Sequence, residues 1–234
     1  MGDARVSAPW SESTFEEHLR DVLAQRYHHI HPFNRRMHEG RLSPEQIRGW
    51  IANRFYYQEA IPVKDALLLS KLPWRYRREW IQRIIDHDGT RSGDGGLEAW
   101  LRLGEAAGVD RADLLEHRLL VPAARFACDA YVGFVRDRPW VEGVASSLTE
   151  LAAPTLMTVR ISAFEEHYPW VKPEGLEYFR RRVAQGPRDA SHALPIVLEH
   201  CRTREDQQRA VDAVSFKCDV LDAFLNAVDA AFPR

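Results

Sequence analysis

Hydrophobic residues recur at spacings of three and four along nearly the whole chain, which is the period of an amphipathic helix. Strict alternation of apolar and polar positions, the pattern of a half-buried strand, is hard to find. Where the apolar stripes begin and end, the chain carries residues that typically start or stop helices. The pattern therefore predicts an all-α fold.

The apolar stripes, together with the residues that start or stop helices, predict a series of helices separated by short connections. Gly186-Pro187 is expected to end one helix, and Pro62 is expected to bend or interrupt another, because proline lacks the N–H that a helix interior needs. Capping boxes are predicted at Ser13-x-x-Glu16, Ser43-Pro44-x-Gln46 and Thr203-x-x-Asp206. The predicted helices span 13–26, 32–39, 43–61, 80–88, 97–103, 122–134, 141–152, 154–164, 174–185, 190–201 and 203–228, with a short element after 110.

Composition narrows the class of protein. The 234 residues are 45% hydrophobic, enough for one sizeable core, so a single domain is expected, with 1–12 as a flexible N-terminal extension. With 32 Lys+Arg against 34 Asp+Glu, the net charge of -2 provides no field to attract nucleic acid or an anionic membrane. The three cysteines form no CxxC pair, and no leader or apolar membrane span is evident, so a cytoplasmic location is expected.

Charged residues occupy unusual places within the apolar stripes. Five cations lie three or four residues from apolar positions and are predicted to point inward, whereas inward carboxylates are few, with Glu150, Asp86 and Asp219 as candidates. Because a buried unpaired cation costs several kcal/mol, the pattern favours a positively charged cavity for a small molecule with several carboxylates. Ordinary salt bridges between helices, or side chains that reach solvent, are the alternative. The five cations are Arg54, Arg83, Arg160, Arg182 and Lys217.

A second group of residues can move protons near neutral pH. It comprises the cluster at 27–31, which contains Tyr27 and His28, together with His87 and Tyr178. Crowded histidines can also bind metal, but the chain contains no Glu-x-x-His and no His-Glu-x-x-His motif, so no metal site is expected. The glycine-rich stretch at 93–96 follows no predicted strand and is interpreted as a helix connection.

Nine ordered motifs together resemble one family. The chain is similar to the pyrroloquinoline-quinone synthases, the C proteins of pyrroloquinoline quinone (PQQ) biosynthesis, from about Phe15 to Val228. The motifs are YHHIHPF (27–33), NRFYYQ (53–58), IPVKDA (61–66), RIIDHDG (83–89), GDGGLEAWLRLGEA (93–106), RFACDAY (125–131), SSLTELAAP (146–154), HYPW (167–170) and FKCDVL (216–221).

The resemblance implies a heme-oxygenase-like bundle of about seven main helices, usually a homodimer, that needs neither a metal nor an organic cofactor. The implied reaction closes the last ring of the tricarboxylate quinone precursor AHQQ and oxidises it with O2 to PQQ, releasing hydrogen peroxide. The quinone passes electrons to O2, so the protein supplies proton transfers, orientation and charge stabilisation.

The resemblance also implies roles for individual residues. His28 and His87 match positions implicated in proton transfer and oxygen chemistry, Tyr178 and Arg182 match the oxygen-binding core, and Tyr131 matches a pocket tyrosine. The positions that match the substrate pocket are Tyr27, Arg54, Tyr57, Gln58, Lys64, Arg83, Thr149, Glu150, Arg160 and Lys217.

One departure from the family pattern keeps alternatives open. Met157 stands where some members have a pocket histidine, so a proton relay through that position is absent. A protein that binds finished PQQ and delivers it to an accepting protein is therefore one alternative. Two others share the implied fold: a heme-degrading oxygenase, in which His28 or a neighbour would ligate heme, and a thiaminase-like hydrolase, which would need a reactive cysteine.

Overall fold

A computed structural model describes residues 8–232, and within that range it contains helices and no strand. The predicted all-α architecture is confirmed. The α-helices are α1 (Glu12–Arg26), α2 (Pro32–His38), α3 (Pro44–Lys71), α4 (Trp74–Asp88), α5 (Gly95–Ala106), α6 (Arg111–Leu115), α7 (Pro122–Asp137), α8 (Trp140–Ser146), α9 (Ala153–His167), α10 (Glu177–His200) and α11 (Arg204–Ala231). Short 3-10 helices are η1 (His28–Ile30), η2 (Ser147–Leu151) and η3 (Pro173–Leu176).

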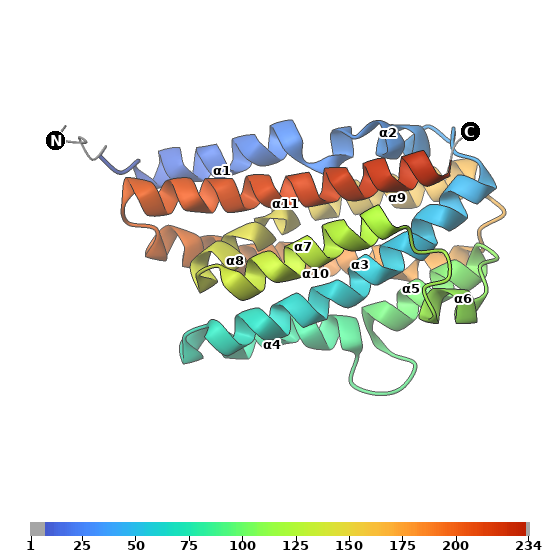
Figure 1. Ribbon diagram of the computed structural model, residues 1–234, viewed down its shortest axis with the longest axis horizontal. Coiled ribbons are helices and arrows are strands. Elements are labelled where there is room, and N and C mark those ends of the chain that lie inside the picture. Colours follow the sequence, from blue (N-terminus) through green and yellow to red (C-terminus); the bar gives the residue numbers. More distant parts are fainter. Residues whose placement is uncertain (1–7, 233–234) are drawn as a thin grey trace.

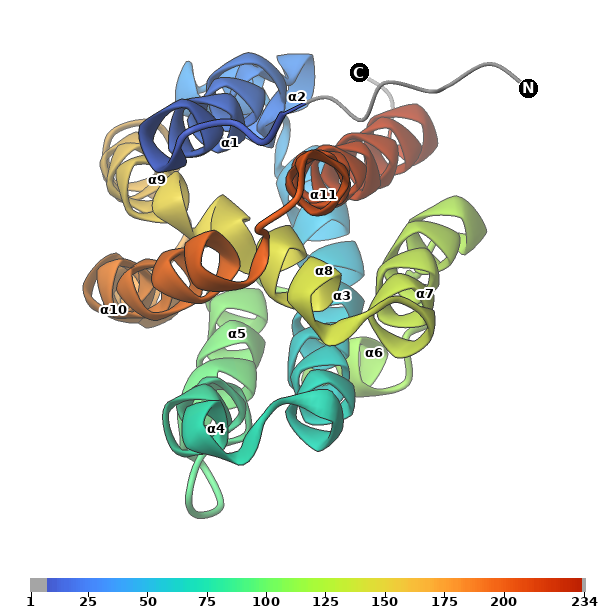
Figure 2. The ribbon, with the colours of Figure 1, turned by 90° about the vertical axis from the view of Figure 1, so that its left-hand side faces the viewer.

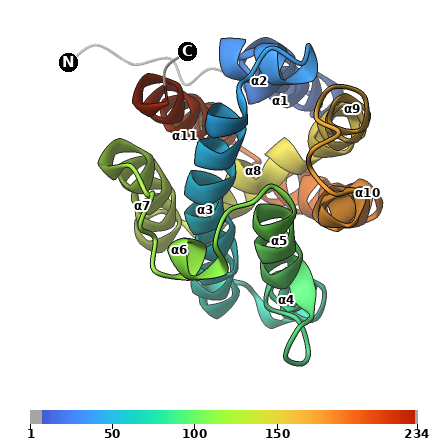
Figure 3. The ribbon, with the colours of Figure 1, turned by 90° about the vertical axis from the view of Figure 1, so that its right-hand side faces the viewer.

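The long helices lie roughly along one axis and form an elongated bundle (Figure 1). Seen from either end, α3 and α8 occupy the middle, with α4 and α5 on one side and α1, α2 and α11 on the other (Figures 2 and 3). Helix α9 packs on α10, and α7 packs on both α3 and α11. This arrangement surrounds the middle of α3 with neighbouring helices.

The apolar interior consists of two clusters. One contains Trp50, Trp100 and Phe179, and the other contains Trp80 and Val214. All five side chains are buried. Residues of α3, α7 and α11 contribute to both clusters, and the buried polar residues described below lie on these helices and on their neighbours.

Two of the three predicted capping boxes are confirmed. Ser43 with Gln46 opens α3, and Thr203 with Asp206 opens α11. The predicted box at Ser13 is wrong, because Ser11 accepts the hydrogen bond from the Thr14 amide and α1 begins before Ser13. A serine two positions earlier therefore accepts from one of the free N–H groups of the first turn.

Prolines interrupt the helices less than predicted. Helix α3 is continuous through Pro62, and α10 runs through both Pro187 and Pro195, so the predicted stop at Gly186-Pro187 is wrong. Each proline removes one backbone hydrogen bond, whereas α10 packs against α9, α8 and η2 along its length. Gly186 fits closely against the ring of Pro154, where a Cβ would lie 2.8 Å from Cγ. Helix α10 therefore continues through Gly186-Pro187 because its contacts with neighbouring helices stabilise it.

The expected N-terminal extension is partly attached to the bundle. Residues 1–7 of the predicted extension lie outside the described residues. The Trp10 amide donates to the side chain of Gln207 on α11 at 2.7 Å, and the Trp10 carbonyl accepts from the same side chain at 3.1 Å. The Arg204 guanidinium stacks on the Trp10 ring at 3.6 Å. The segment that directly precedes α1 is therefore tied to the start of α11.

Candidate active site

A small enclosed cavity lies between α3, α4, α7, α10, α11 and η2. Its volume of about 20 Å³ is close to that of one or two water molecules. Nine of the residues predicted from the sequence line it: Tyr57, Lys64, Arg83, His87, Tyr131, Thr149, Glu150, Arg182 and Lys217. Ile61, Asp65, Ser147 and Asp189 complete the lining.

The remaining predicted residues are buried beside the cavity. The Tyr178 hydroxyl donates to the side-chain oxygen of Gln58 at 2.8 Å. Burial and then Glu150 raise the pKa of Tyr27, while Arg54 and Arg160 lower it, so these groups lie near one another. The His28 ring packs edge-on against Tyr27 with centroids 4.4 Å apart. All the predicted site residues thus gather in one region, where only Glu150 is partly exposed.

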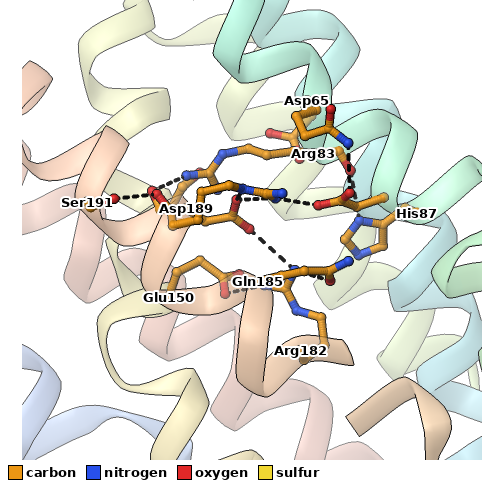
Figure 4. A network of polar contacts seen from close by, with 12 residues as sticks. Asp65, Arg83, His87, Glu150, Arg182, Gln185, Asp189 and Ser191 are labelled. Atoms are coloured by element: carbon orange, nitrogen blue, oxygen red, sulfur yellow. Dashed lines mark hydrogen bonds and ion pairs between the residues drawn. The ribbon is translucent and has the colours of Figure 1, made fainter. Parts of the chain in front are cut away.

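One arginine of the cavity has internal carboxylate partners (Figure 4). Arg182 forms ion pairs with Glu150 on η2 and with Asp189 on its own helix, the latter at 3.3 Å. Arg83 donates to the backbone carbonyl of Asp189. Burial alone would raise the pKa of Asp189, but Arg83 and Arg182 outweigh it and lower that pKa. The Asp189 carboxylate therefore stays charged between two arginines.

Lys64 also has a carboxylate partner. Its ammonium lies 2.7 Å from Asp65 and donates to the Ser147 hydroxyl at 2.9 Å. The indole N–H of Trp80 donates to the same Asp65 oxygen at 3.0 Å. Burial would lower the pKa of Lys64, but Asp65 raises it, so this lysine is a stable cation.

Four buried cations have no carboxylate within ion-pairing distance among the described residues: Arg83, which donates to the Asp189 carbonyl, and Arg54, Arg160 and Lys217. Arg54 stacks on the Tyr57 ring at 3.6 Å, and Lys217 lies 3.5 Å from the centroid of Tyr131. Burial, followed by Arg54 and Lys64, lowers the pKa of Lys217 well below its usual value. Burial and Arg54 lower the pKa of Arg160 to about 9. Positive charge on this side of the site is therefore disfavoured until a ligand supplies negative charge.

The geometry fixes the protonation of His87. Its Nδ1 lies 3.0 Å from the carbonyl oxygen of Arg83. Because a carbonyl can only accept, Nδ1 carries the proton and Nε2 carries a lone pair. Burial and then Arg182 lower the pKa of His87, which keeps the ring neutral. His87 therefore presents a base at the cavity wall.

Four buried polar residues of the site were not predicted from the sequence, namely Asn34, Asp65, Ser147 and Asp189, and one carboxylate was misplaced. Asp189 lies seven residues after Arg182, two turns along the same helix, but the predicted stop at Gly186-Pro187 concealed that relationship. Asp219 is largely exposed and pairs with Arg26 on the surface, and Asp86 pairs with the half-exposed Arg188. The cavity itself is therefore less positive than predicted, because three carboxylates face its four cations.

Comparison with known proteins identifies the family. The model of the TENA/THI-4/PQQC family matches residues 17–227. A pyrroloquinoline-quinone synthase of Pseudomonas aeruginosa is 52% identical over 227 residues, which are 96% of this chain and 90% of that protein. One from Pseudomonas syringae pv. tomato is 51% identical over 233 residues, 99% of this chain and 91% of that protein. The chain belongs to the TENA/THI-4/PQQC family.

Solved structures confirm the fold of this TENA/THI-4/PQQC member. A TenA homolog from Pseudomonas syringae pv. tomato superposes with a TM-score of 0.75 at 16% identity, covering 97% of this chain and 99% of that one. A heme-oxygenase-like domain from Shewanella denitrificans gives 0.71 at 15% identity, with 93% and 89% covered. The heme-oxygenase-like bundle expected from the resemblance is therefore confirmed.

The cysteines of this TENA/THI-4/PQQC member are poor nucleophiles. All three are buried and free. Burial raises the pKa of the Cys128 and Cys201 thiols to about 12 and that of Cys218 to about 11. Because the thiolate is the reactive form, none of them is activated for attack at neutral pH.

Proposed function

We propose that this chain is a pyrroloquinoline-quinone synthase that closes the last ring of the tricarboxylate quinone precursor AHQQ. It oxidises the product to PQQ with O2 and releases hydrogen peroxide. About half of the residues are identical to those of pyrroloquinoline-quinone synthases over nearly the full length of both chains, which supports this assignment.

One structural observation carries the proposal. Arg54, Arg160 and Lys217 are each less than a tenth exposed and lack a carboxylate partner among the described residues. Desolvating three cations without counter-charges destabilises the empty site, and carboxylates of a bound ligand would reverse that cost. The carboxylates of the proposed substrate would supply the negative charge that this side of the site lacks.

The chemistry requires a base, an oriented quinone and stabilisation of reduced oxygen. His87 offers its Nε2 lone pair as the base, and the Arg182 guanidinium is placed to stabilise negative charge on oxygen as electrons reach it. Tyr178, held by Gln58, and Tyr131, beneath Lys217, complete the proposed polar wall. We propose that no metal or organic cofactor takes part, because the quinone itself can pass electrons to O2.

The cavity must enlarge before a tricyclic ligand can enter. A volume of about 20 Å³ is far below the several hundred Å³ of sites for molecules of that size. The ion pair from Arg182 to Glu150 joins α10 to η2 at the cavity, and the pair with Asp189 holds the same guanidinium within α10. We propose that these contacts rearrange on binding, since carboxylates of the substrate compete for the same guanidinium.

A single-turnover assay tests the function. Metal-depleted protein, in excess over the quinone precursor, is followed in air and without O2 by the PQQ spectrum and by peroxide release. Formation of PQQ and peroxide in air alone is the expected result. A chain that binds PQQ tightly yet forms none in air would instead be a binding and delivery protein, the alternative that Met157 keeps open.

The chain's association and location are part of the proposal. We propose a homodimer, as the family resemblance implies, that lies in the cytoplasm and hands PQQ to an accepting protein. The large exposure of Phe126 on α7 and Trp74 on α4 is consistent with a further protein contact. None of the described helices combines the length and hydropathy needed to cross a bilayer. Sedimentation velocity of the purified chain tests the dimer.

A further inference from the structure

Asn34, on α2, links two residues of the site and is itself fully buried. Its side-chain oxygen accepts a hydrogen bond from the Arg160 guanidinium at 2.9 Å. Its side-chain nitrogen lies 2.7 Å from the backbone carbonyl of His28 and 3.1 Å from Nδ1 of the same histidine. Three contacts thus converge on one amide.

The partners determine which way the Asn34 amide faces. A guanidinium can only donate, so the atom facing Arg160 must be the oxygen. A backbone carbonyl can only accept, so the atom facing the His28 carbonyl must be the nitrogen. The two contacts agree, and reversing the amide would break both. The NH2 group of Asn34 therefore faces the imidazole of His28.

The tautomer of His28 follows from that orientation. An amide NH2 group has no lone pair to offer, so Nδ1 of His28 must accept and cannot carry a proton. The ring proton of neutral His28 is then on Nε2. Among the described residues, Nε2 of His28 has no hydrogen-bond partner. It is also not one of the fully enclosed polar atoms that lack a partner, so part of its surface is accessible and it can contact a ligand.

We propose that Asn34 is a positioning residue that holds His28 as a neutral imidazole offering its Nε2–H to an oxygen of the bound quinone. This inference rests on the proposed function and refines the role expected for His28. A ring whose Nδ1 already accepts a hydrogen bond cannot relay protons through both nitrogens. His28 would therefore stabilise developing negative charge without losing its proton, as neutral imidazoles do in other enzymes.

The surroundings of His28 oppose a second proton on the ring. Arg54, Arg160 and Lys217 bring positive charge from three different helices, and the ring of His31 lies close by. Burial, followed by these cations, lowers the pKa of His28 well below its usual value. The neutral form thus dominates wherever the site is intact.

His28 and His87 are consequently fixed in opposite tautomers. Nδ1 of His87 donates to the Arg83 carbonyl, which leaves a lone pair on Nε2, whereas Nδ1 of His28 accepts and leaves a proton on Nε2. One histidine offers a donor and the other offers an acceptor. A substrate that loses a proton while its oxygen gains negative charge needs one of each.

Nitrogen-15 NMR of the whole, unliganded protein with labelled histidines tests the tautomer directly. We expect the Nδ1 resonance of His28 to be that of an unprotonated nitrogen and Nε2 that of an N–H nitrogen, from pH 6.5 to 8.5. On addition of PQQ, the Hε2 resonance should move downfield. A protonated Nδ1 in the wild type, or an Hε2 resonance unmoved by saturating PQQ, would overturn the proposal.

Asn34→Asp provides the variant, because a carboxylate accepts where the amide donated. We expect the His28 proton to move to Nδ1 and single-turnover PQQ formation to slow by about 100-fold, the cost of losing one positioned donor. Asn53→Asp is the matched control, since Asn53 is equally buried but bonds to Gly49, Leu119 and Val121. It should leave the His28 tautomer unchanged, and a shift as large as that of Asn34→Asp would contradict a specific role.

The two proposals fail separately. The tautomer is measured without substrate, so a chain with the expected His28 resonances but no turnover would reject the synthase function and retain the tautomer assignment. Normal turnover together with a protonated Nδ1 of His28 would retain the synthase function and reject the tautomer assignment.

Discussion

Lys64 and Lys217 line the same cavity and are equally buried, yet they differ in their partners. Lys64 lies against Asp65, whereas Lys217 contacts the hydroxyl of Tyr57 and the ring of Tyr131. A carboxylate partner stabilises a buried charge, while a phenol and a ring face do so only in part. The first lysine therefore stabilises the fold, and the second is available to a ligand.

Replacing each lysine by methionine should have opposite effects on stability. Lys217→Met removes an uncompensated charge, so we expect the free energy of unfolding to rise by about 1–2 kcal/mol and PQQ binding to weaken at least about tenfold. Lys64→Met leaves Asp65 without its cation, so we expect a loss of about 3–5 kcal/mol. Urea unfolding and PQQ titration measure both effects.

The pH dependence provides a check on the Lys217 prediction. The pKa of Lys217 is lower in the folded protein than in the unfolded chain, so the unfolded chain binds more protons between these two pKa values. The free energy of unfolding of the wild type therefore increases as the pH rises toward the pKa of the unfolded lysine. The advantage of Lys217→Met should therefore be largest near pH 7 and shrink toward pH 10. A constant difference would show that the gain comes from packing.

The low pKa of His87 predicts the acidic limb of activity. As the base, His87 must be neutral, and burial together with Arg182 holds its pKa below 6.5. As the pH is lowered, single-turnover rates should therefore stay constant past pH 6.5 and fall only at more acidic pH. Arg182→Gln removes the neighbouring cation, so the limb should move to higher pH in addition to any loss of rate. A limb above pH 6.5 in the wild type would exclude His87 as the base.

The sequence identified the site's cations better than their partners. Arginine and lysine within apolar stripes are conspicuous, because helical spacing alone places them inward. Asn34 and Asp65 carry no such signal, since their role depends on which residue of another helix they meet. Resemblance to a family located the pocket positions, whereas the choice between paired and unpaired cations required three-dimensional contacts.

At the scale of elements, the turn between α4 and α5 fixes the end of the helix that carries His87. Gly95 has a φ of +87°, and a Cβ there would lie 2.5 Å from the Gly89 nitrogen and 2.6 Å from the His87 carbonyl oxygen. Gly93 has a similar φ of +79°, but its Cβ would meet only the end of the Arg102 side chain, at 3.8 Å. The turn thus contains a constrained glycine and a matched, open one.

Alanine at the two glycines should separate backbone strain from steric contact. Gly93→Ala should cost about 1 kcal/mol, the penalty of a positive φ. Gly95→Ala adds a clash with backbone atoms, so we expect a loss of about 3 kcal/mol or more, together with slower turnover through displaced His87. Urea unfolding and the single-turnover assay measure both. Equal losses at the two sites would contradict the tight turn.

The errors in predicting helices have a common cause. Local signals located the capping boxes of α3 and α11, where a side chain satisfies nearby N–H groups. They failed at Gly186-Pro187, where contacts with α9 outweigh one lost hydrogen bond. The predicted helix at 141–152 is similarly divided into α8 and η2. Long-range packing decides such points, and a single sequence does not contain it.

At the scale of the whole molecule, the site destabilises the protein in which it lies. Because Arg54, Arg160 and Lys217 lack carboxylate partners, a ligand that supplies them should stabilise the native state beyond ordinary contacts. PQQ at 100 times its dissociation constant should stabilise the wild type by about 2.7 kcal/mol, seen as a higher melting temperature. Lys217→Met should respond less at the same concentration, and an equal response would argue against charge pairing.

The same unmatched charges connect the supply of quinone to the lifetime of the protein. Proteases cleave chains that open transiently, and the fraction that opens falls as a ligand holds the native state together. A cell that makes the precursor would therefore retain more of this enzyme than a cell that does not, with no change in synthesis. Three cations left without partners would thus make the abundance of the enzyme follow the demand for its reaction.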